Sequence, residues 1–218
     1  DEKAKAKDRT YSEFTDAAVF TKLDVKKEGG NLILTANYKL GNLDKAQWTI
    51  HPDGMATLDY TYNFSGVVDL MGIRFDYPED QVISKRWLGA GPYRVWQNRI
   101  HGTQYDVWEN DYNDPIPGET FTYPEFKGYF GSVSWMSIRT KEGTISLRNE
   151  TPDSYIGVYQ PRDGRDRLLY TLPESGISVL NVIPPVRNKV NSTDLCGPSS
   201  QPKWVDGPQT GRLVLRFE

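Results

Sequence analysis

The chain has 218 residues, of which 37% are hydrophobic and 12% aromatic, and its formal net charge at pH 7 is −3. A chain of this length can bury a core of its own, so the composition predicts a folded protein with a polar surface. Acidic and basic residues are interspersed, and no apolar run reaches the roughly 20 residues that cross a bilayer. We therefore expect neither a nucleic acid nor a membrane as a partner.

A charged run from Asp1 to Arg9 opens the chain and is typical of a solvated linker or a cut end. We assign residues 1–10 to this segment. Residues 11–218 are predicted to form a single domain, because no internal repeat or shift in composition marks a boundary. Cys196 is the single cysteine, so an intrachain disulfide is excluded.

Strand patterns then follow one another along the chain. Apolar and polar residues alternate in residues 31–39 and 55–64, which is the period of an antiparallel strand with one solvated face. Turn sequences at residues 29–30 and 51–54 predict hairpins. The predicted strands are Val19–Glu28, Asn31–Lys39, Gln47–Ile50, Met55–Phe64, Met71–Tyr77, Val82–Leu88, Tyr93–Ile100, Gly128–Arg139, Thr144–Asn149, Tyr155–Tyr159, Gly176–Ile183 and Arg212–Phe217.

Two segments interrupt this rhythm. Glu109–Gly118 and Pro184–Gly207 are rich in Pro, Asn, Asp and Gly, and we expect them to be long surface loops. No window has a sustained apolar stripe of helical period, so helix should be minimal. About a dozen strands exceed one small barrel, and they predict an all-β fold, a large antiparallel two-sheet sandwich.

The most specific signal is a set of glycines and aromatic residues with fixed spacing. Its members are Gly72, Phe75, Trp87, Gly89, Gly91, Pro92 and Arg99. This pattern resembles the C-terminal β-sandwich of family 2 glycoside hydrolases of the β-galactosidase type. The chain departs from the family pattern at Arg94, Trp96 and Asn98, where Glu, Tyr and Asp are usual.

The resemblance implies a supersandwich similar to galactose mutarotase, which serves a catalytic (β/α)8 barrel placed earlier in the polypeptide. In the family both catalytic acids lie on that barrel, and the alternating strand and helix pattern of a barrel is absent from this sequence. We therefore expect no catalytic residue and no cofactor in this chain. The implied partners are the barrel and a carbohydrate, a galactoside or related glycan. A periplasmic or extracellular location is favoured.

Two further expectations concern the surface. If a barrel normally covers one sheet face, the isolated domain should expose an unusually large apolar patch. Sugar rings stack on aromatic faces, so aromatic and polar residues in and after the motif are candidates for carbohydrate binding. These candidates are Tyr93, Trp96, Arg99, His101, Tyr105, Trp108 and Trp204. By contrast, we expect Trp48, Trp87 and Trp135 in the core.

Two alternatives stay open. A free-standing carbohydrate-binding module would present coplanar exposed aromatic rings, and a mutarotase-like epimerase or polysaccharide lyase would need His101 or Tyr105 beside a carboxylate in a cleft.

The only histidines are His51 and His101, which do not make a usual zinc site with one cysteine. Acidic residues that could offer oxygens to calcium are favoured as a solvated loop, and we predict no metal site. They are Asp106, Glu109, Asp111 and Asp114.

Overall fold

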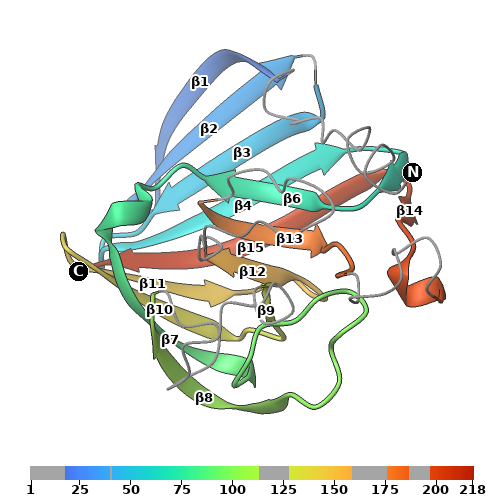
Figure 1. Ribbon diagram of the computed structural model, residues 1–218. Coiled ribbons are helices and arrows are strands. Elements are labelled where there is room, and N and C mark those ends of the chain that lie inside the picture. The colour runs from blue at the N-terminus through green and yellow to red at the C-terminus, as the bar shows by residue number, and fades with distance from the viewer. Residues whose placement is uncertain (1–17, 40, 113–127, 159–175, 187–196) are drawn as a thin grey trace.

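The structure is a computed structural model that describes residues 18–39, 41–112, 128–158, 176–186 and 197–218. Its strands form a nine-stranded, a four-stranded and a two-stranded sheet, all with antiparallel neighbours. The predicted all-β sandwich is confirmed (Figure 1). Among the described residues, no helix is long and apolar enough to cross a membrane.

The large sheet has the order β1-β2-β3-β4-β15-β11-β10-β7-β8. Its strands in that order are β1 (Val19–Glu28), β2 (Asn31–Lys39), β3 (Leu43–Ile50), β4 (Met55–Asn63), β15 (Pro208–Phe217), β11 (Thr144–Asn149), β10 (Trp135–Thr140), β7 (Val82–Gly91) and β8 (Gln104–Asp111). β15 is the last strand of the chain and pairs with β4 and β11 in the middle of the sheet. The C-terminal strand therefore joins the N-terminal hairpins to the rest of the sheet.

The second sheet packs on the central part of the first. It consists of β6 (Met71–Phe75), β13 (Ile177–Val182), β12 (Tyr155–Val158) and β9 (Phe130–Gly131), in that order. In Figure 1 it lies in front of the large sheet, and β1 and β2 extend beyond it at the top. The two-stranded sheet pairs β14 (Lys203–Val205) with β5 (Gly66–Val68), and the 3-10 helices are η1 (Glu79–Gln81) and η4 (Pro198–Ser200).

The core lies between the two large sheets. On β4 the inward residues, such as Leu58 and Tyr62, are buried, while their neighbours are half-buried. Tyr62 donates a hydrogen bond of 2.5 Å to Asn181 Oδ1 across the two sheets. Burial raises the pKa of Tyr62, so this hydroxyl stays protonated and keeps its donor role.

Most predicted strands are present, and three have the expected bounds: β1, β2 and β11. The prediction of a strand over Tyr93–Ile100 is wrong, because the backbone turns back on itself between Trp96 and Arg99. The predicted strand Gly128–Arg139 is interrupted between β9 and β10. β5, β8 and β14 were not anticipated, and β8 and β14 occupy parts of the segments expected to be loops. Residues 1–10 lie outside the described part of the chain.

Candidate functional site

The motif residues of β7 face the interior of the sandwich. Trp87 has no exposed surface, and its ring packs edge-on against Phe130 with centroids 4.7 Å apart. A Cβ on Gly89 would lie 3.0 Å from the carbonyl oxygen of Gly131, and one on Gly91 would lie 2.3 Å from the ring of Trp108. The glycines therefore allow close packing, which is a structural role and not a catalytic one.

The end of the motif ties two distant segments together. Asn98 Nδ2 donates to the carbonyl oxygen of Val186 at 2.7 Å and to Ser200 Oγ at 2.9 Å, and its Oδ1 accepts from the Val186 N–H at 2.9 Å. Gln97 Nε2 donates to the carbonyl oxygens of Ser199 and Gln201, both at 2.8 Å. An amide can donate and accept at once, whereas a carboxylate only accepts. This geometry explains why Asn serves at position 98.

Two cationic side chains of the motif region are enclosed in the core. Arg94 is 2% exposed, and its guanidinium carbon lies 5.0 Å from the centre of the Phe130 ring. Burial lowers the pKa of Arg94 to about 10. Lys85 is 1% exposed and donates to the carbonyl oxygens of Asp111 and Tyr112, both at 2.8 Å. Both side chains are buried within the fold. Arg94, which stands where the pattern that this stretch resembles has Glu, is therefore not a surface group.

Trp96 belongs to the core as well. Its side chain has no exposed surface and packs edge-on against Tyr129, with ring centroids 5.7 Å apart. This placement corrects the expectation that Trp96 contacts a sugar, because an enclosed ring has no free face for stacking. Tyr93 is half-buried, and its hydroxyl donates to the carbonyl oxygen of His101 at 3.2 Å. Arg99 and His101 are exposed; Arg99 closes the turn that begins at Trp96, and His101 lies in the next turn.

Tyr105 and Trp108 lie on opposite faces of β8, because side chains alternate along a strand. Trp108 is opposite Trp87 in the register, which places it on the inner face, and it is half-buried. Tyr105 is exposed on the outer face, where its hydroxyl lies 2.6 Å from Ser134 Oγ. These candidates therefore do not form one platform.

Trp204 is the most exposed large hydrophobic side chain among the described residues, with 70% of its surface accessible. It lies on β14 opposite Val67 of β5, which is 61% exposed. Cross-strand partners lie on the same face of a sheet, so these two side chains form an apolar pair open to solvent. Of the core tryptophans expected, Trp87 is fully buried, whereas Trp48 and Trp135 are partly exposed.

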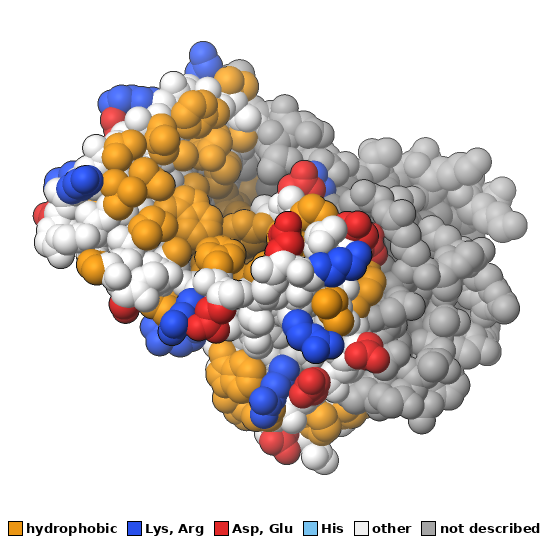
Figure 2. Space-filling view, turned by 90° about the vertical axis from the view of Figure 1, so that its left-hand side faces the viewer, with side chains coloured by type: hydrophobic (Ala, Val, Ile, Leu, Met, Phe, Trp, Pro, Cys, Tyr) orange, Lys and Arg blue, Asp and Glu red, His pale blue; other side chains and the backbone are white. Residues whose placement is uncertain are grey.

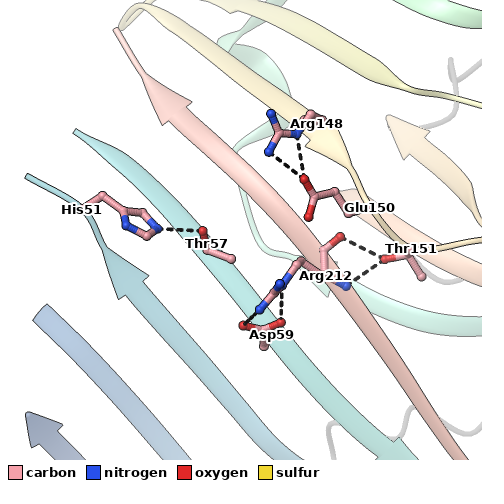
Figure 3. Close-up of polar contacts among 7 residues, drawn as sticks. All are labelled: His51, Thr57, Asp59, Arg148, Glu150, Thr151 and Arg212. Carbon is pink, nitrogen blue, oxygen red and sulfur yellow. Dashed lines mark hydrogen bonds and ion pairs between the residues drawn. The ribbon is translucent and has the colours of Figure 1, made fainter. Parts of the chain in front are cut away.

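The outer face of the large sheet carries a polar cluster that the sequence analysis missed (Figure 3). Arg212 on β15 bonds Asp59 on β4 through two nitrogens, at 2.6 and 3.0 Å, and Arg148 contacts Glu150 at 2.6 Å. These side chains are exposed to solvent, so water and salt screen the ion pairs and they add little to stability. Only the strand register shows that Arg212 faces Asp59, which is 153 positions earlier. The cluster is a solvated face of paired charges.

The acidic residues of β8 do not form a cation site. The side chain of Asp106 lies on the inner face of β8, whereas those of Glu109 and Asp111 lie on its outer face. The strand therefore separates their carboxylates. Within the described ranges, no group of three or more His, Cys, Asp or Glu side chains is placed to hold a metal ion. Asp114 lies outside the described residues.

Among the described residues, the inner face of the N-terminal strands is apolar, half-buried on β2 and exposed on β1. A cross-strand row joins Val25, Leu34, Trp48 and Leu58 on β1 to β4. Leu58 is 2% exposed and Val25 is 60% exposed, so the row begins in the core and ends in solvent. Trp48 contacts Phe75 of β6, which is the edge strand of the second sheet. Figure 2 shows hydrophobic side chains gathered over this end of the molecule.

No family model and no curated protein matches this chain. In the part of the chain that the structure describes, two surface features are available to a partner: the exposed pair of Trp204 and Val67, and the apolar inner face of β1, β2 and β3.

Proposed function

We propose that this chain is the C-terminal supersandwich domain of a family 2 glycoside hydrolase of the β-galactosidase type. In this proposal it is catalytically silent by itself, packs against the catalytic barrel of the same polypeptide and contributes to the binding of a galactoside or related glycan. The observation that carries the proposal is the open apolar face of β1, β2 and β3, which continues the core beyond the second sheet. Large exposed apolar patches on soluble proteins mark places where another protein, a membrane or a ligand binds.

The occupant that we propose for this face is the catalytic barrel. β1 is the first described strand, so a domain that precedes it in a longer polypeptide is tethered beside the face. Tethering raises the local concentration of the two surfaces, which favours their contact without a large interface. Contact with the barrel would cover Leu23 and Val25, which are exposed aliphatic side chains. Full burial of such a side chain contributes up to about 1.5 to 3 kcal/mol to the free energy of association.

The placement of the motif supports an accessory role. Trp87, Gly89 and Gly91 pack the interior, and Asn98 fixes a distant segment, so these residues build the fold. None of them presents a nucleophile or an acid-base pair to solvent. A chain whose most specific sequence signal is structural is consistent with a scaffold for a site on another domain.

Trp204 is the residue that we propose as the sugar-stacking face. Its ring is 70% exposed, so Trp204→Ala should change the free energy of unfolding by less than about 0.5 kcal/mol. Loss of a stacking contact should weaken glycan binding or raise KM by several-fold to about tenfold. Titration calorimetry or steady-state kinetics on the full polypeptide checks this, and Trp204→Phe should retain most of the affinity. Equal affinity for the Ala and Phe variants would exclude a stacking role.

A free-standing carbohydrate-binding module is the second candidate, and the exposed pair of Trp204 and Val67 favours it. This candidate predicts glycan affinity in the isolated chain without turnover. The accessory role predicts weak or no affinity until the barrel is present.

The deciding experiment assays the isolated chain for three activities. These are hydrolysis of nitrophenyl galactosides, glucuronides and mannosides, interconversion of sugar anomers, and binding across a glycan array. We expect no turnover. Turnover of any sugar would reject the accessory role. Hydrogen exchange tests the contact with the barrel: the amides of β2 should be protected more strongly in the full polypeptide than in the isolated chain.

A further inference from the structure

The edge of β1 that points away from β2 is a second feature, and it is separate from the apolar face. β1 is a 10-residue strand without Gly or Pro, and among the described residues only β2 pairs with it. The outer side of such a strand presents unpaired N–H and C=O groups, which are a template for another strand. All of its residues are exposed.

The charges on β1 alternate in sign along one face. The outer face carries Lys22, Asp24, Lys26 and Glu28. Lys22 contacts Asp24, and the Lys26 ammonium lies 2.7 Å from the Glu28 carboxylate. An edge with lysines alone would repel a second copy, which is a common protection against aggregation. Here each lysine is followed by a carboxylate, so the same edge can match itself.

We propose that two copies of this chain pair through β1, antiparallel about a twofold axis at Val25, so that the two large sheets become continuous. An antiparallel pair about this axis places Lys22 opposite Glu28 of the partner subunit. It also places Asp24 opposite Lys26 of the partner subunit. The axis repeats both contacts, so four pairs of opposite charge face each other, and pairs of this kind stabilise a sheet.

Other positions of the axis are less favourable. An axis at Asp24 or at Lys26 would place like charges directly opposite each other, which is destabilising. An axis at Leu23 would place Lys26 opposite Phe20 of the partner subunit, where the register of β1 is broken between Phe20 and Lys22. Among the axes at Leu23, Asp24, Val25 and Lys26, the charge pattern therefore selects the one at Val25.

The inner face of β1 agrees with this register. Val25 meets Val25 of the partner subunit, and Leu23 meets the aliphatic stem of the partner subunit's Lys27. Leu23 is 50% exposed and Val25 is 60% exposed in the single chain, so both lose solvent contact on pairing. Main-chain hydrogen bonds supply affinity, and the alternating charges supply register, as in other cases of strand addition.

Charge-swapped variants test the pairing directly. Lys22→Glu/Lys26→Glu makes the outer face of β1 wholly acidic, and Asp24→Lys/Glu28→Lys makes it wholly basic. We expect the unchanged chain to sediment at twice its 24.8 kDa mass at micromolar concentration, and each variant alone to sediment as a monomer. An equimolar mixture of the two variants should restore the dimer, because every acidic position then faces a basic one.

A matched control separates the edge from net charge. Lys45→Glu/Lys141→Glu lowers the net charge as much as Lys22→Glu/Lys26→Glu does, but at exposed positions away from β1, and it should leave the dimer intact. Circular dichroism confirms that each variant is folded. A monomeric unchanged chain, a dimer that survives either swap, or a mixture that stays monomeric would each overturn the proposal.

Discussion

Gly72→Ala is expected to destabilise the protein by about 3 kcal/mol, the upper end for forcing extra atoms into a packed site. A Cβ at this position would lie 2.1 Å from the carbonyl oxygen of Val179 and 2.6 Å from the Cα of Leu180. Both are backbone atoms of β13, so they cannot turn aside as a flexible side chain would. The register between β6 and β13 also shifts here, between Leu180 and Val182. The glycine is therefore required by the close approach of the two strands.

Urea unfolding measures this effect as a fall in the transition midpoint at constant slope. Gly197→Ala is the matched control, because its Cβ would have no heavy atom within 4 Å and its φ is −63°. We expect the control to change stability by less than about 0.5 kcal/mol. Equal stability of the two variants would show that β13 moves away from β6 without cost.

Asn98→Asp should cost about 2 to 3 kcal/mol above pH 6, although Asp is usual at this position in the family motif that the stretch resembles. The carboxylate would lose both hydrogen bonds that Nδ2 donates, and it would face the carbonyl oxygen of Val186 at the 2.7 Å now spanned by a donor. The bond from the Val186 N–H would remain. Because the ionised form is disfavoured in the folded chain, the pKa of the new carboxyl should be raised above its unfolded value.

The pH dependence provides an independent check. A carboxyl with a raised folded pKa binds its proton more tightly in the native state, so the deficit of Asn98→Asp should grow as pH rises through the unfolded value of about 4. Below that value it should shrink, because a protonated carboxyl donates again. Thermal unfolding at pH 3.5 and pH 7 measures the difference. Asn63→Asp on an exposed position of β4 is the control, and a similar loss in both variants would contradict the anchoring role of Asn98.

Local periodicity was sufficient for the strands that have one wet face. β2 and β11 alternate in sequence, and their bounds agree with the prediction. β8 was missed because Gln104–Asp111 is largely polar or charged, and it is a strand because it pairs with β7 along its whole length. Tyr93–Ile100 has strand-like composition, but the bonds of Gln97 and Asn98 to distant segments hold it in a turn.

The candidate site was predictable in part. Trp204 was expected on an open segment and is exposed, while Trp96 was expected to contact sugar and is buried against Tyr129. Tryptophan and tyrosine occur both on surfaces that stack against sugars and in hydrophobic cores, so their presence in the sequence does not distinguish the two locations. The polar cluster of Asp59 and Arg212 could not be anticipated, because residues so distant in sequence meet only through the pairing of β4 with β15.

The sequence by itself determined the all-β class and most of the strands. These features depend on the alternation of apolar and polar residues, which acts over a few residues. The tertiary structure alone decided which aromatic rings are enclosed, that the inner face of β1 to β3 continues the core into solvent, and that among the described strands only β2 pairs with β1. Those properties depend on strand order and on what covers each face, and both are set by contacts between residues far apart in the chain.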